Sequence, residues 1–130
     1  MPLVKIDVIK GTRTREEIQK LGATIQRVMI EHFGAPRRDR YQIVTQHEDY
    51  EIMCEDTDLG FPRSNKLVII QIFQQGRDQQ QKKTVYRALH ESLSSQCGVS
   101  GNDLIVTCVE NTREDWSFGM GEAQFLTNQL

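Results

Sequence analysis

The length and charge of the chain exclude several classes of protein. Its 130 residues can bury one hydrophobic core but not two, so we expect a single domain, 1–130, without a linker. A net charge of −2, with no run rich in lysine and arginine, argues against nucleic-acid and anionic membrane partners. The N-terminus lacks the apolar stretch of a signal peptide, and no window approaches the ~18 apolar residues of a membrane span. We therefore expect a cytoplasmic protein.

Pro2 is the first residue of chemical interest, because removal of Met1 would expose a secondary amine. Such an amine ionises far below a lysine ammonium and can act as base, acid or nucleophile near neutral pH. A proline also starts a strand without cost, since its missing N–H is not needed there. Position alone leaves both interpretations open, and in a molecule that keeps Met1 this nitrogen is an amide without such chemistry.

The first half of the chain predicts a strand, a helix and a second strand. The apolar run Leu3–Ile9 is followed by a capping box from Thr14 to Glu17, whose hydroxyl and carboxylate satisfy backbone donors reciprocally. Apolar residues then recur at helical spacing up to Gly34, which is placed as a left-handed stop. A strand containing Ile43–Thr45 completes the unit.

The segment Glu48–Asn65 is acidic and rich in turn residues, and we expect a hairpin around His47–Asp49. Asp56–Gly60 faintly resembles a calcium loop, but an EF-hand needs a ligand where Gly60 stands, so we interpret it as a solvated loop. The histidines are scattered without metal-ligand spacing. We therefore predict no metal site.

The second half repeats the order of the first. The strand Leu67–Phe73 is almost continuously apolar, as a central strand covered on both faces would be. A more polar helix, roughly Asp78–Gln96, and a strand containing Ile105–Thr107 follow. Each half is thus a βαβ unit, and the chain is a tandem repeat.

Two βαβ units of this length fold most simply as an α+β domain. The expected form is a four-stranded sheet with both helices on one face and right-handed crossovers. Two helices leave the other sheet face without cover from the chain itself. We therefore expect that apolar face to pack against other subunits in a closed oligomer.

Several motifs occur together at distances similar to those of a known family. They are Pro2, Asp39–Gln42, Glu55–Thr57 with Leu59–Gly60, Val109–Asn111, Asp115–Gly119 and Gln124–Thr127. On these motifs, which span the whole chain, the sequence resembles the malonate semialdehyde decarboxylase branch of the tautomerase superfamily. The resemblance implies a tautomerase-like fold, a homotrimer, and a lyase or isomerase that acts on a small oxo acid without a cofactor.

The resemblance also assigns roles to individual residues. It makes Pro2 the catalytic amine, Asp39 its acidic partner and Arg77 the cation that binds the substrate carboxylate. A 3-oxo acid loses carbon dioxide when its carbonyl is polarised by a cationic proline or converted to an iminium, because the departing electrons need an acceptor. Structural roles remain open as well: Asp39 could form a turn, Arg77 could contact a helix end, and the aromatic residues of the C-terminal segment could belong to the core or to a subunit interface. The apolar wall of the site would be Trp116, Phe118, Phe125 and Leu130.

One position departs from the family. The resembling decarboxylase carries two arginines at the strand-to-helix turn, separated by one residue, and Gln75 stands at the first of these positions. Arg77 with Gln75 would also suit a 2-oxo acid such as phenylpyruvate, tautomerised between keto and enol forms by neutral Pro2. Nearby candidates for a replacement cation are Arg37, Arg38 and Arg40.

Three functions therefore stay open. The first is a decarboxylase or hydratase of small 3-oxo acids such as malonate semialdehyde, and the second is the keto–enol tautomerase. The third is a non-enzymatic binding module on a ferredoxin-like sheet. It is the least favoured, because RNA-binding sheets of that kind carry exposed aromatic residues and basic charge that this chain lacks.

Overall fold

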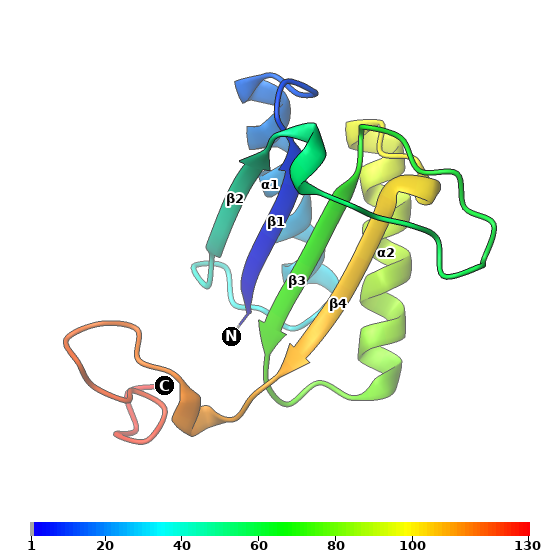
Figure 1. The fold of residues 1–130 in the computed structure, drawn as a ribbon. Coiled ribbons are helices and arrows are strands. Elements are labelled where there is room, and N and C mark those ends of the chain that lie inside the picture. Colours follow the sequence, from blue (N-terminus) through cyan, green and yellow to red (C-terminus); the bar gives the residue numbers. More distant parts are fainter. Residues whose placement is uncertain (1) are drawn as a thin grey trace.

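Four strands form one mixed sheet in the order β2-β1-β3-β4, with two long helices behind it (Figure 1). The computed structural model describes residues 2–130. β1 pairs in parallel with β2, β3 pairs in parallel with β4, and the antiparallel pair β1–β3 joins the two halves. The predicted tandem βαβ repeat is therefore confirmed. The elements are β1 (Leu3–Ile9), α1 (Arg15–His32), β2 (Tyr41–His47), β3 (Val68–Gln74), α2 (Gln79–Cys97) and β4 (Leu104–Glu110).

Both helices begin at capping boxes that the sequence encodes. The Oγ1 of Thr14 accepts from the backbone N–H of Glu17 (3.2 Å), and the N–H of Thr14 donates to Glu17 Oε1 (2.9 Å). Asp78 and Gln81 form the same reciprocal pair at the start of α2, at 2.8 and 3.0 Å. Each pair satisfies backbone donors that a helix start leaves without partners. The sequence thereby fixes where each helix begins relative to the strand before it.

The core lies between the sheet and the helices. Side chains at alternate positions of the two central strands face the helices and are buried, as the two-residue period of a strand requires. The helices cover them with one apolar stripe each. The main contributors are Val4, Ile6 and Val8 of β1, Val68, Ile70 and Ile72 of β3, Leu21, Ile25, Val28 and Met29 of α1, and Val85, Leu89 and Leu93 of α2.

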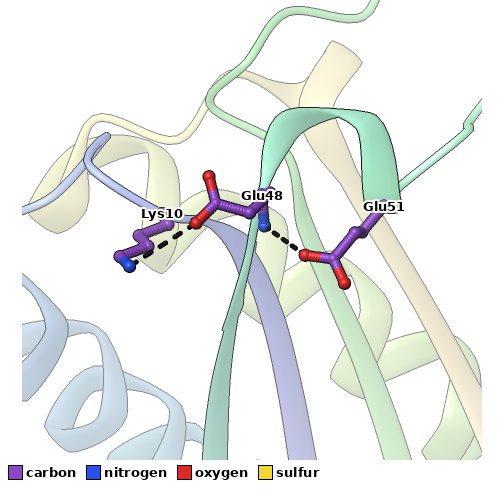
Figure 2. Close-up of polar contacts among 3 residues, drawn as sticks. All are labelled: Lys10, Glu48 and Glu51. Atoms are coloured by element: carbon purple, nitrogen blue, oxygen red, sulfur yellow. Dashed lines mark hydrogen bonds and ion pairs between the residues drawn. The ribbon is translucent and has the colours of Figure 1, made fainter.

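The hairpin predicted around His47–Asp49 is wrong. A single 3-10 turn, Asp49–Glu51, follows β2, and Figure 2 shows the contacts around it. The N–H of Glu48 donates to Glu51 Oε1 (2.8 Å), and Lys10 Nζ lies 3.5 Å from Glu48 Oε1. A hairpin needs a returning antiparallel neighbour, but the next strand, β3, pairs with β1 and not with β2.

The sheet face opposite the helices is only partly covered (Figure 1). Ile43 on β2 is 50% exposed there, and Tyr41 beside it is 39% exposed. The long segment that leads to β3 is tied to the start of β4, where Ser64 donates from its N–H and its hydroxyl to the two carboxylate oxygens of Asp103, each at 2.7 Å. Within residues 2–130, neither long helix has the length and apolar character needed to cross a membrane.

Candidate active site

Pro2 lies where several segments that are distant in sequence come together. Leu3 pairs with Tyr41 of β2 and with Phe73 of β3, so Pro2 sits between the residues just before β2 and the last residue of β3. Pro2 is buried. The helices run antiparallel to the strands that precede them, so α1 ends and α2 begins at this same edge of the sheet (Figure 1).

Asp39 is a buried carboxyl near this position, since the register sets Arg40 opposite Pro2 and Asp39 is the residue before Arg40. It is 7% exposed, its N–H donates to the carbonyl of Pro36 (3.0 Å), and Gln26 Nε2 donates to its backbone carbonyl (3.4 Å). Its side-chain Oδ2 is buried and has no hydrogen-bond partner in the described part of the chain. Burial raises the pKa of Asp39, and the charge of Arg77 opposes that rise. A carboxyl with a raised pKa can exchange protons closer to neutral pH.

Arg77 is held rigidly by the backbone around it. Gly76 has φ +72°, a conformation that favours glycine, and it turns the chain between β3 and α2. Arg77 Nε donates to the carbonyl of Phe33 (2.9 Å), and Nη1 donates to the carbonyl of Gln75 (2.7 Å). The guanidinium lies over the Phe33 ring, 5.0 Å from its centroid. Burial lowers the pKa of Arg77, and the charge of Asp39 opposes that shift.

The hydrogen bonds of Arg77 leave one edge of its guanidinium for a ligand. They use Nε and one N–H of Nη1, so the other N–H of Nη1 and both of Nη2 remain. This edge suits a bidentate pair with a carboxylate. The guanidinium is preorganised, because both of its hydrogen-bond acceptors are backbone carbonyls, which do not move with side-chain rotamers.

Gln75 and the other basic residues occupy different places. Gln75 is half-buried and lines a cavity of about 480 Å³ together with the segment after β4, including Arg113. Of the proposed replacement cations, Arg37 and Arg38 are exposed, and Arg40 is held by Gln42, whose Oε1 accepts from its Nε (3.1 Å). Arg77 therefore influences the pKa of Asp39 through its charge, and none of these three arginines is among the causes of that shift.

The aromatic residues of the C-terminal segment form one cluster. The ring of Phe118 stacks on Trp116 (5.4 Å between centroids), meets Phe125 edge-on (5.6 Å) and contacts Tyr41 of β2 (5.5 Å). With Leu3 and Ser117, three of these rings line a cleft of about 250 Å³ on the open sheet face. Leu130 is 55% exposed, and none of these ring contacts includes it.

Sequence analysis assigned no individual role to two polar residues at this edge. Asn111 accepts from Trp116 Nε1 (2.8 Å) and so fixes the indole. Gln74 is completely buried at the end of β3, on the same face as the apolar residues that precede it. A polar residue that continues the apolar side of a core strand is the signal by which Gln74 could have been found. Within residues 2–130 no three His, Cys, Asp or Glu side chains gather as metal ligands do.

Two family profiles, each described as tautomerase enzyme, match the chain over residues 39–119 and residues 2–61. The chain belongs to the tautomerase superfamily. The chain is 45% identical to the probable tautomerase YrdN of Bacillus subtilis (strain 168) over the full length of both chains. It is 35% identical to the probable tautomerase YusQ of the same organism, over 97% of this chain and 99% of the relative.

Solved structures give the branch of the superfamily. The chain is 42% identical to malonate semialdehyde decarboxylase, with a TM-score of 0.95 over 98% of each chain. It is 40% identical to FG41 malonate semialdehyde decarboxylase, with a TM-score of 0.93 over 98% of this chain and 97% of the other. The resemblance that the sequence motifs predicted, and the tautomerase-like α+β fold, are therefore confirmed.

Proposed function

We propose that this member of the tautomerase superfamily is a decarboxylase or hydratase of small 3-oxo acids such as malonate semialdehyde, with the N-terminal amine of Pro2 as its catalytic group. The observation that carries the proposal is the buried carboxyl of Asp39, whose Oδ2 lacks a hydrogen-bond partner among residues 2–130 and which lies within electrostatic reach of the tethered Arg77. The similarity to malonate semialdehyde decarboxylase, which has decarboxylase and hydratase activities and was also studied as a proline-to-alanine variant, supports it.

The site residues suit each step of a decarboxylation. Arg77 binds the substrate carboxylate, and the ammonium of Pro2 donates a hydrogen bond to the oxo group. The bond between the carboxylate carbon and its neighbour breaks, carbon dioxide leaves, and the electron pair moves to the oxo oxygen. That oxygen takes a proton from Pro2, and the resulting enol returns to the carbonyl form in water. The apolar surroundings strengthen both contacts by lowering the local dielectric constant.

A second function, keto–enol tautomerisation of 2-oxo acids such as phenylpyruvate, is favoured by two observations. Gln75 stands where the resembling decarboxylase has an arginine, so Arg77 is the one arginine of this turn that can bind a substrate carboxylate. The cleft lined by Tyr41, Trp116 and Phe118 offers aromatic surfaces to a phenyl ring. In this reaction neutral Pro2 would take the enol proton and return a proton to the neighbouring carbon.

The two functions are separated by one assay. Untagged protein with a free Pro2 is incubated with malonate semialdehyde and with the enol of phenylpyruvate, and kcat/KM is measured for each. The proposal expects faster turnover of malonate semialdehyde. Faster ketonisation of phenylpyruvate would favour the second function, and turnover of neither would reject both.

Arg77→Ala should lower kcat/KM for any acid substrate by about 10- to 100-fold, because a hydrogen bond to a charged group contributes about 1.5–3 kcal/mol. Gln75→Arg should improve binding of a 3-oxo acid about fivefold, the difference of about 1 kcal/mol between charged and neutral pairs. Steady-state kinetics with Arg87→Ala, an exposed arginine of α2, provides the control. Unchanged kinetics in Arg77→Ala would show that another group anchors the carboxylate.

We also propose that the protein is a homotrimer that covers the open sheet face. Sedimentation equilibrium should give three times the 15.0 kDa chain mass. Ile43→Asp places a charge on that half-exposed apolar face and should shift the mass toward the monomer. A monomer with full activity would contradict the trimer, and an intact trimer of the variant would place the interface elsewhere.

A further inference from the structure

Gln74 carries a buried amide that neither the fold nor the proposed chemistry has used so far. Its side chain is 0% exposed, and neither Oε1 nor Nε2 has a hydrogen-bond partner among residues 2–130. A buried donor and acceptor without partners destabilise a folded protein. The preceding positions on the same face, Val68, Ile70 and Ile72, are all apolar. An apolar residue would therefore suit the fold better than Gln74 does.

The strand register makes Gln74 the neighbour of Pro2. Leu3 pairs with Phe73, so the next position of this antiparallel ladder sets Pro2 opposite Gln74. The carbonyl of Gln74 accepts from the N–H of Asn111, just beyond β4 (2.9 Å), so the backbone of Gln74 turns away from β1. Opposed residues that do not exchange backbone hydrogen bonds bring their side chains closest together.

The same alternation orients the nitrogen of Pro2. Because backbone groups of successive residues point to opposite sides of a strand, the nitrogen of Pro2 turns toward β2, which follows Asp39. The register sets Arg40 opposite Pro2 on the β2 side, with Asp39 one residue before it, and it sets Gln74 opposite Pro2 on the β3 side. The side-chain Oδ2 of Asp39 is also without a partner, so these two buried groups do not satisfy each other.

We propose that Gln74 is a further substrate-binding residue, whose Nε2 donates a hydrogen bond to the oxo oxygen of an oxo acid held by Pro2 and Arg77. This inference rests on the proposed function and extends it. Negative charge develops on the oxo oxygen when the carbon–carbon bond breaks. A desolvated donor that is already in place stabilises that charge without reorganisation. The register sets Gln74 opposite Pro2, so a substrate held at Pro2 lies beside the amide.

The first test compares two ligands that differ only in the oxo group. 2-Oxobutyrate and butyrate carry the same carboxylate and chain length, neither is a 3-oxo acid that the enzyme would decarboxylate, and their Kd values are measured by titration calorimetry. The wild-type protein should bind 2-oxobutyrate about tenfold more tightly, the size of one hydrogen bond to an oxo group. Gln74→Met, which keeps the side-chain length, should lose this preference and bind butyrate as before. Its kcat for a 3-oxo acid should fall about 100-fold, as for other single oxyanion donors.

Gln42→Met is the matched control on the same sheet face. The Nε2 of Gln42 donates to the carbonyl of Gly22 (2.8 Å), and its Oε1 accepts from Arg40 (3.1 Å), so that amide is satisfied within the fold. Gln42→Met should lower Tm and keep the ligand preference. Gln74→Met should keep or raise Tm and lose the preference.

Each other outcome overturns the inference in a recognisable way. If Gln74→Met keeps the preference while the wild type turns over its substrate, only the role of Gln74 fails. If Gln74→Met lowers Tm as Gln42→Met does, the amide is structural. If Gln74→Met shifts the pKa of the Pro2 amine, followed by ¹⁵N NMR, Gln74 serves the amine and not the substrate. If the wild type neither prefers 2-oxobutyrate nor turns over an oxo acid, the proposed function fails and this inference with it.

Discussion

A preparation that retains Met1 should lose more than about 99% of the activity found with a free Pro2, because general acid–base groups contribute about 10²- to 10⁴-fold to rates. An acylated proline nitrogen neither accepts a proton nor attacks a carbonyl near neutral pH. The test pairs the intact mass of each preparation with its kcat/KM for malonate semialdehyde and phenylpyruvate. A tag that blocks the terminus should act as Met1 does.

Pro2→Ala separates the loss of the amine from the loss of its ring. The variant starts with a primary amine once Met1 is removed, so it should keep a minor fraction of the activity. The protein that retains Met1 and the Pro2→Ala variant should both unfold near the wild-type temperature, because Leu3–Ile9 still pairs on both sides within the sheet. Full turnover by protein that retains Met1 would reject both enzymatic functions proposed for Pro2.

The fold was largely predictable because several local signals agree with one another. The capping box from Thr14 to Glu17 and the stop at Gly34 bound the first helix, and the structure places α1 between them. The apolar run Leu67–Phe73 predicted a central strand, and β3 is central, although it begins one residue later. Periodicity and caps act over a few residues, so they can be recognised without knowledge of the tertiary structure.

The hairpin prediction failed because pairing is not a local property. The turn residues after His47 are real, and they form the 3-10 turn Asp49–Glu51. Whether a turn returns a strand to its neighbour depends on where the next strand finds a partner. Here β3 pairs with β1 and β4, and it leaves β2 at the edge of the sheet.

The site was predictable in part. Pro2, Asp39 and Arg77 came from motifs that resemble a family, and the structure brings the last two within reach of each other's charge. The tethers of Arg77 were not predictable, since its partners are the backbone carbonyls of Phe33 and Gln75. A carbonyl is present at every residue, so the sequence does not indicate which one a guanidinium binds.

Asp39 and Gln74 share a property that packing alone does not select. Each is buried beside Pro2 with side-chain polar atoms that lack partners in the described residues. Another buried polar group, the carboxylate of Asp103, is satisfied by Ser64. The remaining buried side-chain atom without a partner among residues 2–130 is Nη1 of Arg13, which lies beyond the other end of β1 from Pro2. Two such groups near Pro2 are expected where a ligand supplies the missing contacts.

Asp39→Asn should lower kcat/KM by about 10²- to 10⁴-fold, because the amide keeps the shape of the carboxyl but neither ionises nor transfers a proton. The loss of a neighbouring negative charge should also lower the pKa of the Pro2 amine, since a carboxylate favours the ammonium form. The measurement is the pH dependence of kcat/KM together with ¹⁵N NMR of Pro2. Asp49→Asn, at an exposed position on the 3-10 turn, provides the control.

The stability of Asp39→Asn should change in the opposite direction to its activity, and the sign follows from proton linkage. Burial raises the pKa of Asp39, so between the unfolded value of about 3.9 and the raised value the folded protein binds more protons than the unfolded chain. The free energy of unfolding of the wild type therefore falls as pH rises through this window. That of the asparagine variant does not fall there, because asparagine does not titrate. At fixed protein concentration, Tm of the variant relative to the wild type should be higher at pH 7 than at pH 4. A difference in Tm that is the same at both pH values would mean that Asp39 has no raised pKa, and its assignment as the acidic partner of Pro2 would lose its electrostatic basis.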